Sequence, residues 1–305
     1  MGAGAGMMRR YLTVIVLLLV ISLGGCQSSK RAQFDGRRAF KHVDNLCRFG
    51  PRCVGSEASE KTSAYIARVL EQYGWEVESQ SFANRGEHLT NVIGKKGTGP
   101  IIILGTHYDT RPLADKDPVD RSQPVMGAND GGSGVGVLLE LARVLDKSAT
   151  DQAEIWLIFF DGEDRGDIDG WQWCVGSRYF VDFVNEHPEY RPEYVLIVDM
   201  VGDKEQEIFY EWSSALWLEE KVWRTANDLG YGGQFIPKYG YRIIDDHTPF
   251  LEWGMTAALV IDFDYPYHHT RADTMDKISA DSLQRVGEVI EVLLDGEPFA
   301  SSVRN

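Results

Sequence analysis

The sequence predicts a single α/β domain in which a mostly parallel, mixed central sheet is flanked by helices in three layers. Short, nearly uninterrupted apolar runs alternate with helical patterns along the chain, as in parallel sheets whose strands are buried on both faces. No proline- or glycine-rich linker divides residues 36–298. The length of 305 residues is ample for one large core. One domain is therefore expected over this range.

The expected elements follow from periodicity in chain order. Helical periodicity begins near residue 36, and residues 59–74 form an amphipathic helix pattern that stops at Gly74. The alternating segments WEVESQSF and LTNVIGKK predict a pair of strands, with residues 97–100 as the turn. Buried strands are then expected in IIILGTHYDT, EIWLIFF, YVLIVDMVG and TAALVIDF, and helices at GGSGVGVLLELARVLDK and near residues 176–187, 214–229 and 279 onwards.

The N-terminus predicts export. Arg9 and Arg10 precede a short apolar run and then LGGC at residues 23–26, the order of a secretory signal, and the run is too short for a comfortable membrane span. LGGC resembles the lipobox of bacterial lipoproteins, which implies that the mature chain begins at a lipidated Cys26. A simple secretory signal or an uncleaved anchor is the alternative.

The resemblance to lipoproteins implies a protein on the periplasmic side of a bacterial membrane, held there only through its lipid. Gln27 after the cysteine favours the outer membrane. We therefore expect a signal over residues 1–26, a tether over 27–35, the folded domain over 36–298 and a tail over 299–305.

Charge and cysteine content exclude some classes of function. The net charge of −15 argues against nucleic acid, whose phosphates need basic surfaces, and suits a protein that holds cations. Cys47 and Cys53 could form a disulfide around a small loop in an oxidising compartment. No C-x-x-C pair supports a zinc finger.

Acidic and imidazole side chains follow the predicted strands. Ligands of such sheets bind beyond the carboxyl ends of the strands, and carboxylate and imidazole groups together suit zinc. Each residue taken alone could be a helix cap or a hydrogen-bonded structural residue, but five such coincidences are disfavoured. The residues concerned are His107 with Asp109, Asp130, the group Asp161, Glu163 and Asp164, Asp199, and His268 with His269.

The segment LIFFDGEDRG places three carboxylates within four residues directly after a buried strand. They repel one another, so a cation or a proton is expected among them. Asp161 is interpreted as orienting the turn, and Gly162 as permitting its sharpness. The acidic segment LADKDPVD at residues 113–120 could be a lid near the site, but a solvated loop is the favoured interpretation.

Six segments resemble, in order, the zinc aminopeptidase family that includes the glutaminyl cyclases. The resemblance runs from about residue 45 to residue 295, nearly the whole mature chain, and also includes GPRCVGSEASEKTSAYI. The segments are GTHYDT, GANDGGSGVGVLLELARVL, LIFFDGED, GSRYF, DDHTPFLEWG and HHTRADTMDKIS.

The resemblance implies a zinc site. His107, Asp130 and Asp199 are similar to the ligands of one zinc in the two-zinc aminopeptidases. Asp130, Asp164 and His269 are similar to the ligands of the other, with Asp130 bridging. The cyclases resemble them but hold a single zinc on the second set. Asp164 departs from the Glu more often found in the family.

The same resemblance implies catalytic roles for other residues. Glu163 matches the general base. The two acids of IIDDHTPFLEWG are similar to a pair in the cyclases, whose first member, here Asp245, joins Asp199 in a catalytic hydrogen-bond network. Trp171 and Trp173 lie where cyclases carry a pocket-wall tryptophan.

Two positions depart from the cyclases. His268 stands where a Trp usually precedes the last zinc histidine, and Leu259 stands where animal cyclases have a His. The function expected is nevertheless a zinc-dependent glutaminyl cyclase that converts the N-terminal Gln of a peptide or protein to pyroglutamate and releases ammonia. The alternatives are an aminopeptidase with one or two zinc ions and, less favoured, a non-catalytic binding domain.

Overall fold

The computed structural model describes residues 32–145 and 147–296. The predicted signal at residues 1–26, most of the tether and the tail at 299–305 lie outside these residues. Among the described helices, none is both long and apolar enough to cross a membrane.

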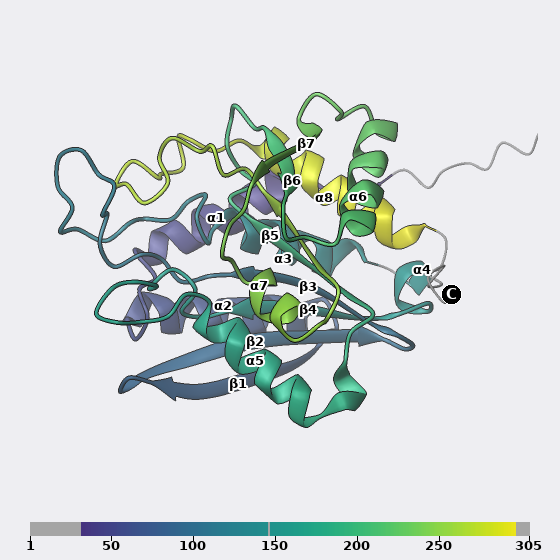
Figure 1. Cartoon of the computed structure of the whole chain (residues 1–305), viewed down its shortest axis with the longest axis horizontal. Coiled ribbons are helices and arrows are strands. Elements are labelled where there is room, and N and C mark those ends of the chain that lie inside the picture. The colour runs from purple at the N-terminus through teal and green to yellow at the C-terminus, as the bar shows by residue number, and fades with distance from the viewer. Residues whose placement is uncertain (1–31, 146, 297–305) are drawn as a thin grey trace, which may run out of the picture. The chain divides into compact units, whose positions relative to one another are not determined.

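The described part of the chain is built on one mixed sheet (Figure 1). Four strands of the sheet pair in parallel. The first two strands of the chain pair antiparallel with each other, and the second of them pairs antiparallel with one of the four. The prediction of a mostly parallel, mixed sheet in an α/β domain is confirmed. The strand order is β1 (Glu76–Asn84), β2 (Glu87–Gly97), β4 (Glu154–Phe160), β3 (Ile101–His107), β5 (Tyr194–Asp199) and β8 (Ala257–Ile261).

Alternate residues of β3 face two separate hydrophobic cores. Ile102 and Leu104 pack on the face covered by α1 (Gly36–Phe49), α2 (Glu57–Gln72), α3 (Ser133–Val144) and α8 (Ala280–Asp295). Ile103 packs on the opposite face, beneath α5 (Val175–Glu186) and α7 (His247–Glu252) (Figure 1). Each fully buried aliphatic side chain contributes about 1.5–3 kcal/mol. Packing on both faces therefore fixes the parallel strands, and with them the positions of their carboxyl ends.

The turn of the first hairpin differs from the prediction. Arg85 and Gly86 connect β1 to β2 with φ angles of 52° and 89°. Positive φ at both central residues is typical of the tight hairpin turns that match strand twist. Residues 97–100, the predicted turn, instead lead from β2 into β3. The single glycine of this turn is a weaker signal than the two glycines of residues 97–100.

A second, smaller sheet was not predicted. β6 (Ile208–Glu211) pairs in parallel with β7 (Phe235–Tyr241) across α6 (Leu216–Asp228). β7 is largely exposed apart from Phe235, so it lacks a clear apolar alternation. The short helices α4 (Lys147–Thr150) and α7, and the 3-10 turn Pro188–Tyr190, were also not predicted.

The possible disulfide between Cys47 and Cys53 is not formed in the structure, where both thiols are free. Cys47 lies in α1 and packs against the larger core. Cys53 lies beyond the helix, with its Sγ 4.0 Å from Oγ1 of Thr110. The two side chains thus belong to different environments.

Glu219 of α6 gives a pH-dependent prediction for stability. Its side chain is fully buried, Oε1 accepts the N–H of Glu211 at 2.7 Å, and Oε2 has no partner. Burial raises its pKa to about 8. Because the folded-state pKa exceeds the unfolded value, folding is favoured below the unfolded pKa and loses stability as pH rises through about 8.

Glu219→Gln keeps the acceptor for Glu211 and removes the charge. We expect the variant to have a higher Tm than the wild type at pH 9, and a similar Tm at pH 5. Thermal unfolding followed by circular dichroism at both pH values tests this. An equal change in Tm at the two pH values would contradict a role for ionisation.

Candidate metal centre

The carboxyl ends of the parallel strands bring acidic and imidazole groups together. His107 ends β3, Asp199 ends β5, and Asp130 lies in the loop before α3. Nε2 of His107 is 3.1 Å from Oδ1 of Asp199 and 3.3 Å from Oδ1 of Asp130. All three side chains are buried. These residues form one group that could hold a metal ion.

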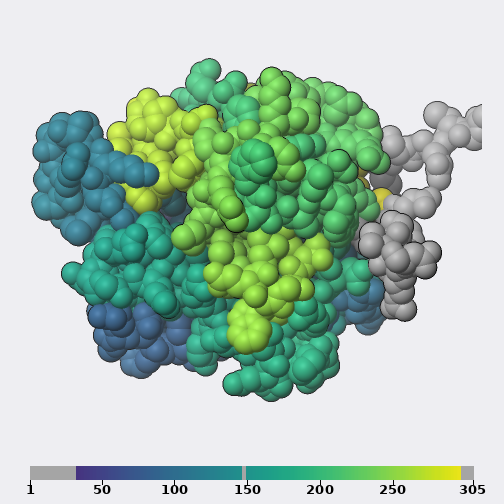
Figure 2. Space-filling model, viewed as in Figure 1, coloured from purple at the N-terminus to yellow at the C-terminus, as the bar shows by residue number. Residues whose placement is uncertain are grey.

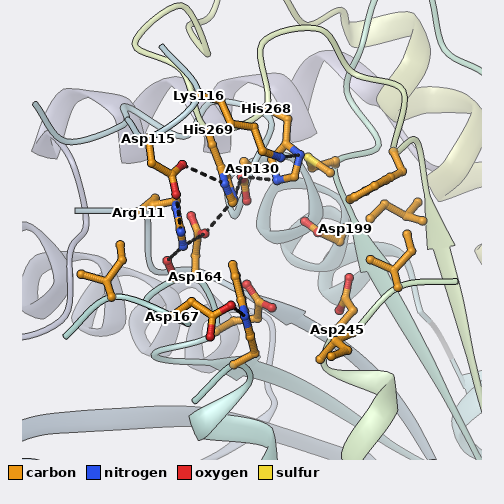
Figure 3. Close-up of a pocket in the computed structure, with 18 of the residues that line it drawn as sticks. Arg111, Asp115, Lys116, Asp130, Asp164, Asp167, Asp199, Asp245, His268 and His269 are labelled. Carbon is orange, nitrogen blue, oxygen red and sulfur yellow. Dashed lines mark hydrogen bonds and ion pairs between the residues drawn. The ribbon is translucent and has the colours of Figure 1, made fainter. Parts of the chain in front are cut away.

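A second set shares Asp130 with the first, and its members Asp130, Asp164 and His269 are labelled in Figure 3. Nε2 of His269 lies 3.1 Å from Oδ1 of Asp164 and 3.8 Å from Oδ2 of Asp130. Oδ2 of Asp130 and both oxygens of Asp164 are buried without a hydrogen-bond partner. Buried carboxylate oxygens without partners are costly. Their number and their imidazole neighbour fit a zinc ion.

Two further aspartates position this set through backbone hydrogen bonds. Asp109 accepts the N–H groups of Glu163 at 3.0 Å and Asp164 at 3.1 Å. Asp273 accepts the N–H of Asp130 at 3.1 Å. Asp109 was predicted at the strand end, but Asp273 was not predicted. The only signal for Asp273 was its place four residues after His269, within HHTRADT.

Asp161 lies beside the site and holds the turn, as interpreted from the sequence. Its Oδ2 accepts the N–H of Thr90 at 3.0 Å, and it does not line the cavity described below. Gly162 has φ 79°, and an added Cβ would lie 2.5 Å from Cδ2 of Leu89. Glycine is therefore required by both backbone conformation and space.

Glu163 is a buried acid beside the metal-binding set. Burial raises the pKa of Glu163 well above its usual range, and although the charge of His107 opposes this, the charges of Asp245 and other acids reinforce it. Sγ of Cys174 donates a hydrogen bond to Oε1 of Glu163 at 3.4 Å. Burial and the charge of Asp199 likewise raise the pKa of Asp245. Both acids are thus able to hold a proton.

His107 behaves in the opposite way to an ordinary buried histidine. Burial lowers its pKa, but the charge of Asp199 and contacts with Asp109 and Asp130 outweigh burial and raise the pKa well above the usual range. A protonated His107 would partly neutralise the acids around it.

A cavity of about 590 Å³, which we call the site cavity, is lined by Glu163 and Asp245 together with Asp130, Asp164, Asp199 and His269. Trp173 forms part of its wall, and its ring lies parallel to that of His269, with centroids 6.2 Å apart. Trp171, also predicted to line the pocket, does not line the site cavity. Its side chain is 4% exposed and packs with Val54, Phe82 and Leu89. The other apolar lining residues are Ile168, Met200, Ile243, Ile244, Ile261 and Phe263.

The segment at residues 113–120 is not simply a solvated loop. Asp115 and Lys116 line the site cavity. Lys116 donates its backbone N–H to the carbonyl of His269 at 3.2 Å. Figure 2 shows this part of the chain, in blue, against the yellow-green segment that contains His269. The sequence offered little signal, because a short acidic segment that contains a proline is typical of exposed loops.

Arg111 connects this segment to the metal-binding set. It is buried, and its guanidinium contacts Oδ2 of Asp115 at 2.5 Å and the carbonyl of Asp164 at 3.0 Å. The guanidinium also lies 4.9 Å from the centre of the Trp173 ring. It fixes the loop, the wall of the cavity and one metal-binding residue together. This role of Arg111 was not predicted from the sequence.

The mixed sheet and its buried carboxylate–imidazole cluster are those of an α/β protein able to hold a metal ion, and the fold matches solved zinc-dependent exopeptidases and glutaminyl cyclases. The profile of Peptidase family M28 matches residues 91–294. The chain belongs to this family, whose members include aminopeptidases and glutaminyl cyclases.

Some of the proteins similar to this chain are named aminopeptidases or exopeptidases, and others glutaminyl cyclases. Aminopeptidase YwaD of Bacillus subtilis (strain 168) is 32% identical over 208 residues, which cover 62% of this chain and 39% of YwaD. A Zn-dependent exopeptidase from Parabacteroides distasonis ATCC 8503 has a TM-score of 0.80 and 33% identity, covering 88% of this chain and 100% of that chain. Glutaminyl cyclase of Bacteroides thetaiotaomicron has a TM-score of 0.79 and 32% identity, covering 87% and 99%.

Proposed function

We propose that the protein is a zinc-dependent glutaminyl cyclase that converts an N-terminal Gln to pyroglutamate and releases ammonia. The proposal rests on the position of Asp245. This buried acid lines the site cavity in addition to the residues that would hold a metal. Its neighbour Asp246 turns away and accepts the hydroxyl of Ser177 at 2.6 Å. Asp245 instead lines the site cavity together with Asp199 and Glu163. Burial and the charge of Asp199 raise the pKa of Asp245, and the charge of Asp245 in turn adds to the effect of burial in raising the pKa of Glu163.

The residues of the site divide the chemistry between them. Zinc held by Asp130, Asp164 and His269 would polarise the side-chain amide carbonyl of the substrate Gln. Glu163 takes a proton from the α-amine as its nitrogen attacks the amide carbon. It then gives that proton to the nitrogen of the breaking C–N bond, which departs as ammonia.

Asp199 and Asp245 orient the amine during this exchange. The raised pKa of Asp245 lets it hold a proton and donate a hydrogen bond, while Asp199 accepts one. The apolar wall formed by Trp173 and Ile243 limits the Gln side chain to folded conformations. Ring closure is intramolecular, so holding the amine against the amide carbon supplies much of the rate gain.

Product analysis of a Gln-initiated peptide tests the proposal. Mass spectrometry of peptide incubated with zinc-loaded protein should show loss of ammonia with the chain intact, faster than the spontaneous reaction. The Glu163→Gln variant provides the matched background. Release of a free first residue would instead identify an aminopeptidase.

The aminopeptidase alternative is favoured by one observation. His107, Asp130 and Asp199 form a second group able to hold a metal, as a two-metal hydrolase requires. Glu163 would then take its proton from water, and water would attack the peptide carbonyl. The two reactions use the same acid and differ in which nucleophile it activates.

We also propose that the protein is an exported lipoprotein anchored through Cys26 to the periplasmic side of a bacterial membrane, from the LGGC motif and the basic and apolar residues before it. Cys26→Ala should abolish incorporation of radiolabelled palmitate in a bacterial host and leave the protein unprocessed. Continued labelling of this variant would exclude the lipobox as the site of modification.

A further inference from the structure

Two adjacent histidines face the same carboxylate. Nε2 of His268 and Nε2 of His269 each lie 3.8 Å from Oδ2 of Asp130. By distance alone, Asp130, His268 and His269 could together hold a metal ion. The groups behind the two rings, however, have opposite chemistry (Figure 3).

Consecutive residues of one loop contact the rear nitrogens of these rings. Oδ1 of Asp115 lies 3.3 Å from Nδ1 of His269, and Nζ of Lys116 lies 3.0 Å from Nδ1 of His268. A carboxylate only accepts hydrogen bonds, whereas an ammonium group only donates them. The hydrogen bond from the ammonium group therefore holds His268 with its proton on Nε2. Oδ1 of Asp115 makes no hydrogen bond, but its negative charge 3.3 Å from Nδ1 of His269 favours the proton of that ring on Nδ1.

The two tautomers present different forms of Nε2 to the site cavity. His269 presents an unprotonated Nε2 to Asp130 and Asp164, and a carboxylate behind a ligating histidine is the usual arrangement at metal sites. His268 presents an Nε2–H, which has no lone pair for a metal. At 3.8 Å that Nε2 is also too far from Asp130 for a good hydrogen bond. Its donor remains free to bind another acceptor in the site cavity.

The backbone fixes which loop residue meets which histidine. The N–H of Lys116 donates to the carbonyl of His269 at 3.2 Å, and the N–H of Arg271 donates to Oδ2 of Asp117 at 2.9 Å. These two hydrogen bonds hold residues 116–117 against residues 269–271. A shift of one residue would exchange the acidic and basic partners.

We propose that Lys116 keeps His268 off the metal and makes its Nε2–H a donor to the main-chain carbonyl of the first substrate residue. This choice of acceptor rests on the proposed cyclase function, in which the side-chain amide oxygen of Gln is directed to the metal. The main-chain carbonyl is then the nearest remaining strong acceptor of the first residue. Phe263, whose ring meets that of His268 at 62° with centroids 5.3 Å apart, holds the imidazole in place.

Tautomers can be measured without reference to activity. Long-range ¹H–¹⁵N NMR of zinc-loaded, histidine-labelled protein should show His268 as the Nε2–H form and His269 as the Nδ1–H form, with His268→Ala used for assignment. Lys116→Met should remove the preference at His268, and Lys116→Arg should preserve it. A wild-type His268 protonated on Nδ1 would overturn the assignment.

Metal affinity provides a second independent measurement. Chelator competition should find zinc affinities of His268→Ala and Lys116→Met within about twofold of the wild type, because His268 is not a ligand. Loss of a ligand would cost at least the tenfold typical of changes to groups around a metal. A tenfold weaker affinity in His268→Ala would therefore overturn the proposal.

Steady-state kinetics test the substrate contact. With a Gln-initiated peptide, His268→Ala should raise KM about fivefold to tenfold with little change in kcat, as for loss of one hydrogen bond. His268→Gln, which retains an N–H near the same place, should restore KM. An analogue whose first main-chain carbonyl is replaced by CH₂ should bind both wild type and His268→Ala with equal affinity.

The outcomes separate the two proposals. If the wild type cyclises the peptide but His268→Ala leaves KM unchanged, the contact with the main-chain carbonyl is wrong and the cyclase function stands. If the wild type does not cyclise the peptide, the cyclase function and this substrate contact both fail. The NMR and zinc measurements still decide whether Lys116 holds His268 away from the metal.

Discussion

Glu163→Gln is expected to lower kcat by about a hundred- to ten-thousand-fold, the range typical of a general acid–base group, without loss of zinc. Glutamine has the same shape and keeps an oxygen that can accept the Cys174 thiol, which lies 3.4 Å from Oε1. It cannot take up a proton from the substrate amine. Ammonia release and bound zinc, measured on the same preparation, test both parts of the prediction.

A matched control distinguishes this effect from general damage. Glu57 lies in the first turn of α2 with its side chain 79% exposed, so Glu57→Gln should have wild-type activity and stability. Full activity of Glu163→Gln would remove the role assigned to Glu163. Loss of zinc from that variant would instead show that Glu163 helps to hold the metal.

The strand ends of the site could be predicted because they follow from burial. A strand covered on both faces is a continuous apolar run, so the first polar residue after it marks the edge of the sheet. His107 and Asp199 were located in this way, and the structure brings them within 3.1 Å of each other. Asp130 and Asp164 lie in the adjoining loops and meet the same edge.

Loop contacts could not be predicted in the same way. Trp171 and Trp173 lie in the same short segment, and the sequence does not distinguish which of them faces the site. Of the two, Trp173 lines the site cavity and Trp171 does not. The loop that carries them has positive φ angles of 61° at Asp167, 52° at Asp169 and 62° at Cys174. These left-handed residues redirect the chain, and an aspartate or cysteine is a weak signal for them compared with glycine.

The segment with Asp115 and Lys116 shows a different limit. Its composition is that of a solvated loop, and its place is set by backbone and side-chain bonds to a segment more than 150 residues away. Such contacts have no periodic pattern in the sequence. The only prior indication was His268 itself, which departs from the resembled cyclases and requires a polar partner where they have an indole.

Asp130→Asn is expected to have the second large effect, because Asp130 belongs both to the group with His107 and Asp199 and to the set with Asp164 and His269. Asparagine lacks the negative charge, and its NH₂ group cannot ligate. Changes to groups that merely support a ligand cost about tenfold to a hundredfold in metal affinity, so loss of this shared ligand should cost at least a hundredfold. Chelator competition measures the affinity, and Asp276→Asn, at an exposed side chain, is the control.

Asp164→Asn and Asp199→Asn then distinguish one metal from two. Nε2 of His107 and Oδ1 of Asp199 are hydrogen-bonded at 3.1 Å, whereas both oxygens of Asp164 are buried without a hydrogen-bond partner. The set of Asp130, Asp164 and His269 therefore has the greater need of a cation. We expect one bound zinc in the wild type, its retention in Asp199→Asn and its loss in Asp164→Asn.

Metal analysis of dialysed protein gives the answer directly. Two zinc ions in the wild type and one in Asp199→Asn would contradict the single-metal site and favour the aminopeptidase reaction. Retention of the single zinc in Asp199→Asn together with impaired ammonia release would leave Asp199 a role toward the substrate. The same aspartate can serve as a metal ligand or as a hydrogen-bond partner of Asp245, and the zinc content of this one variant separates the two roles.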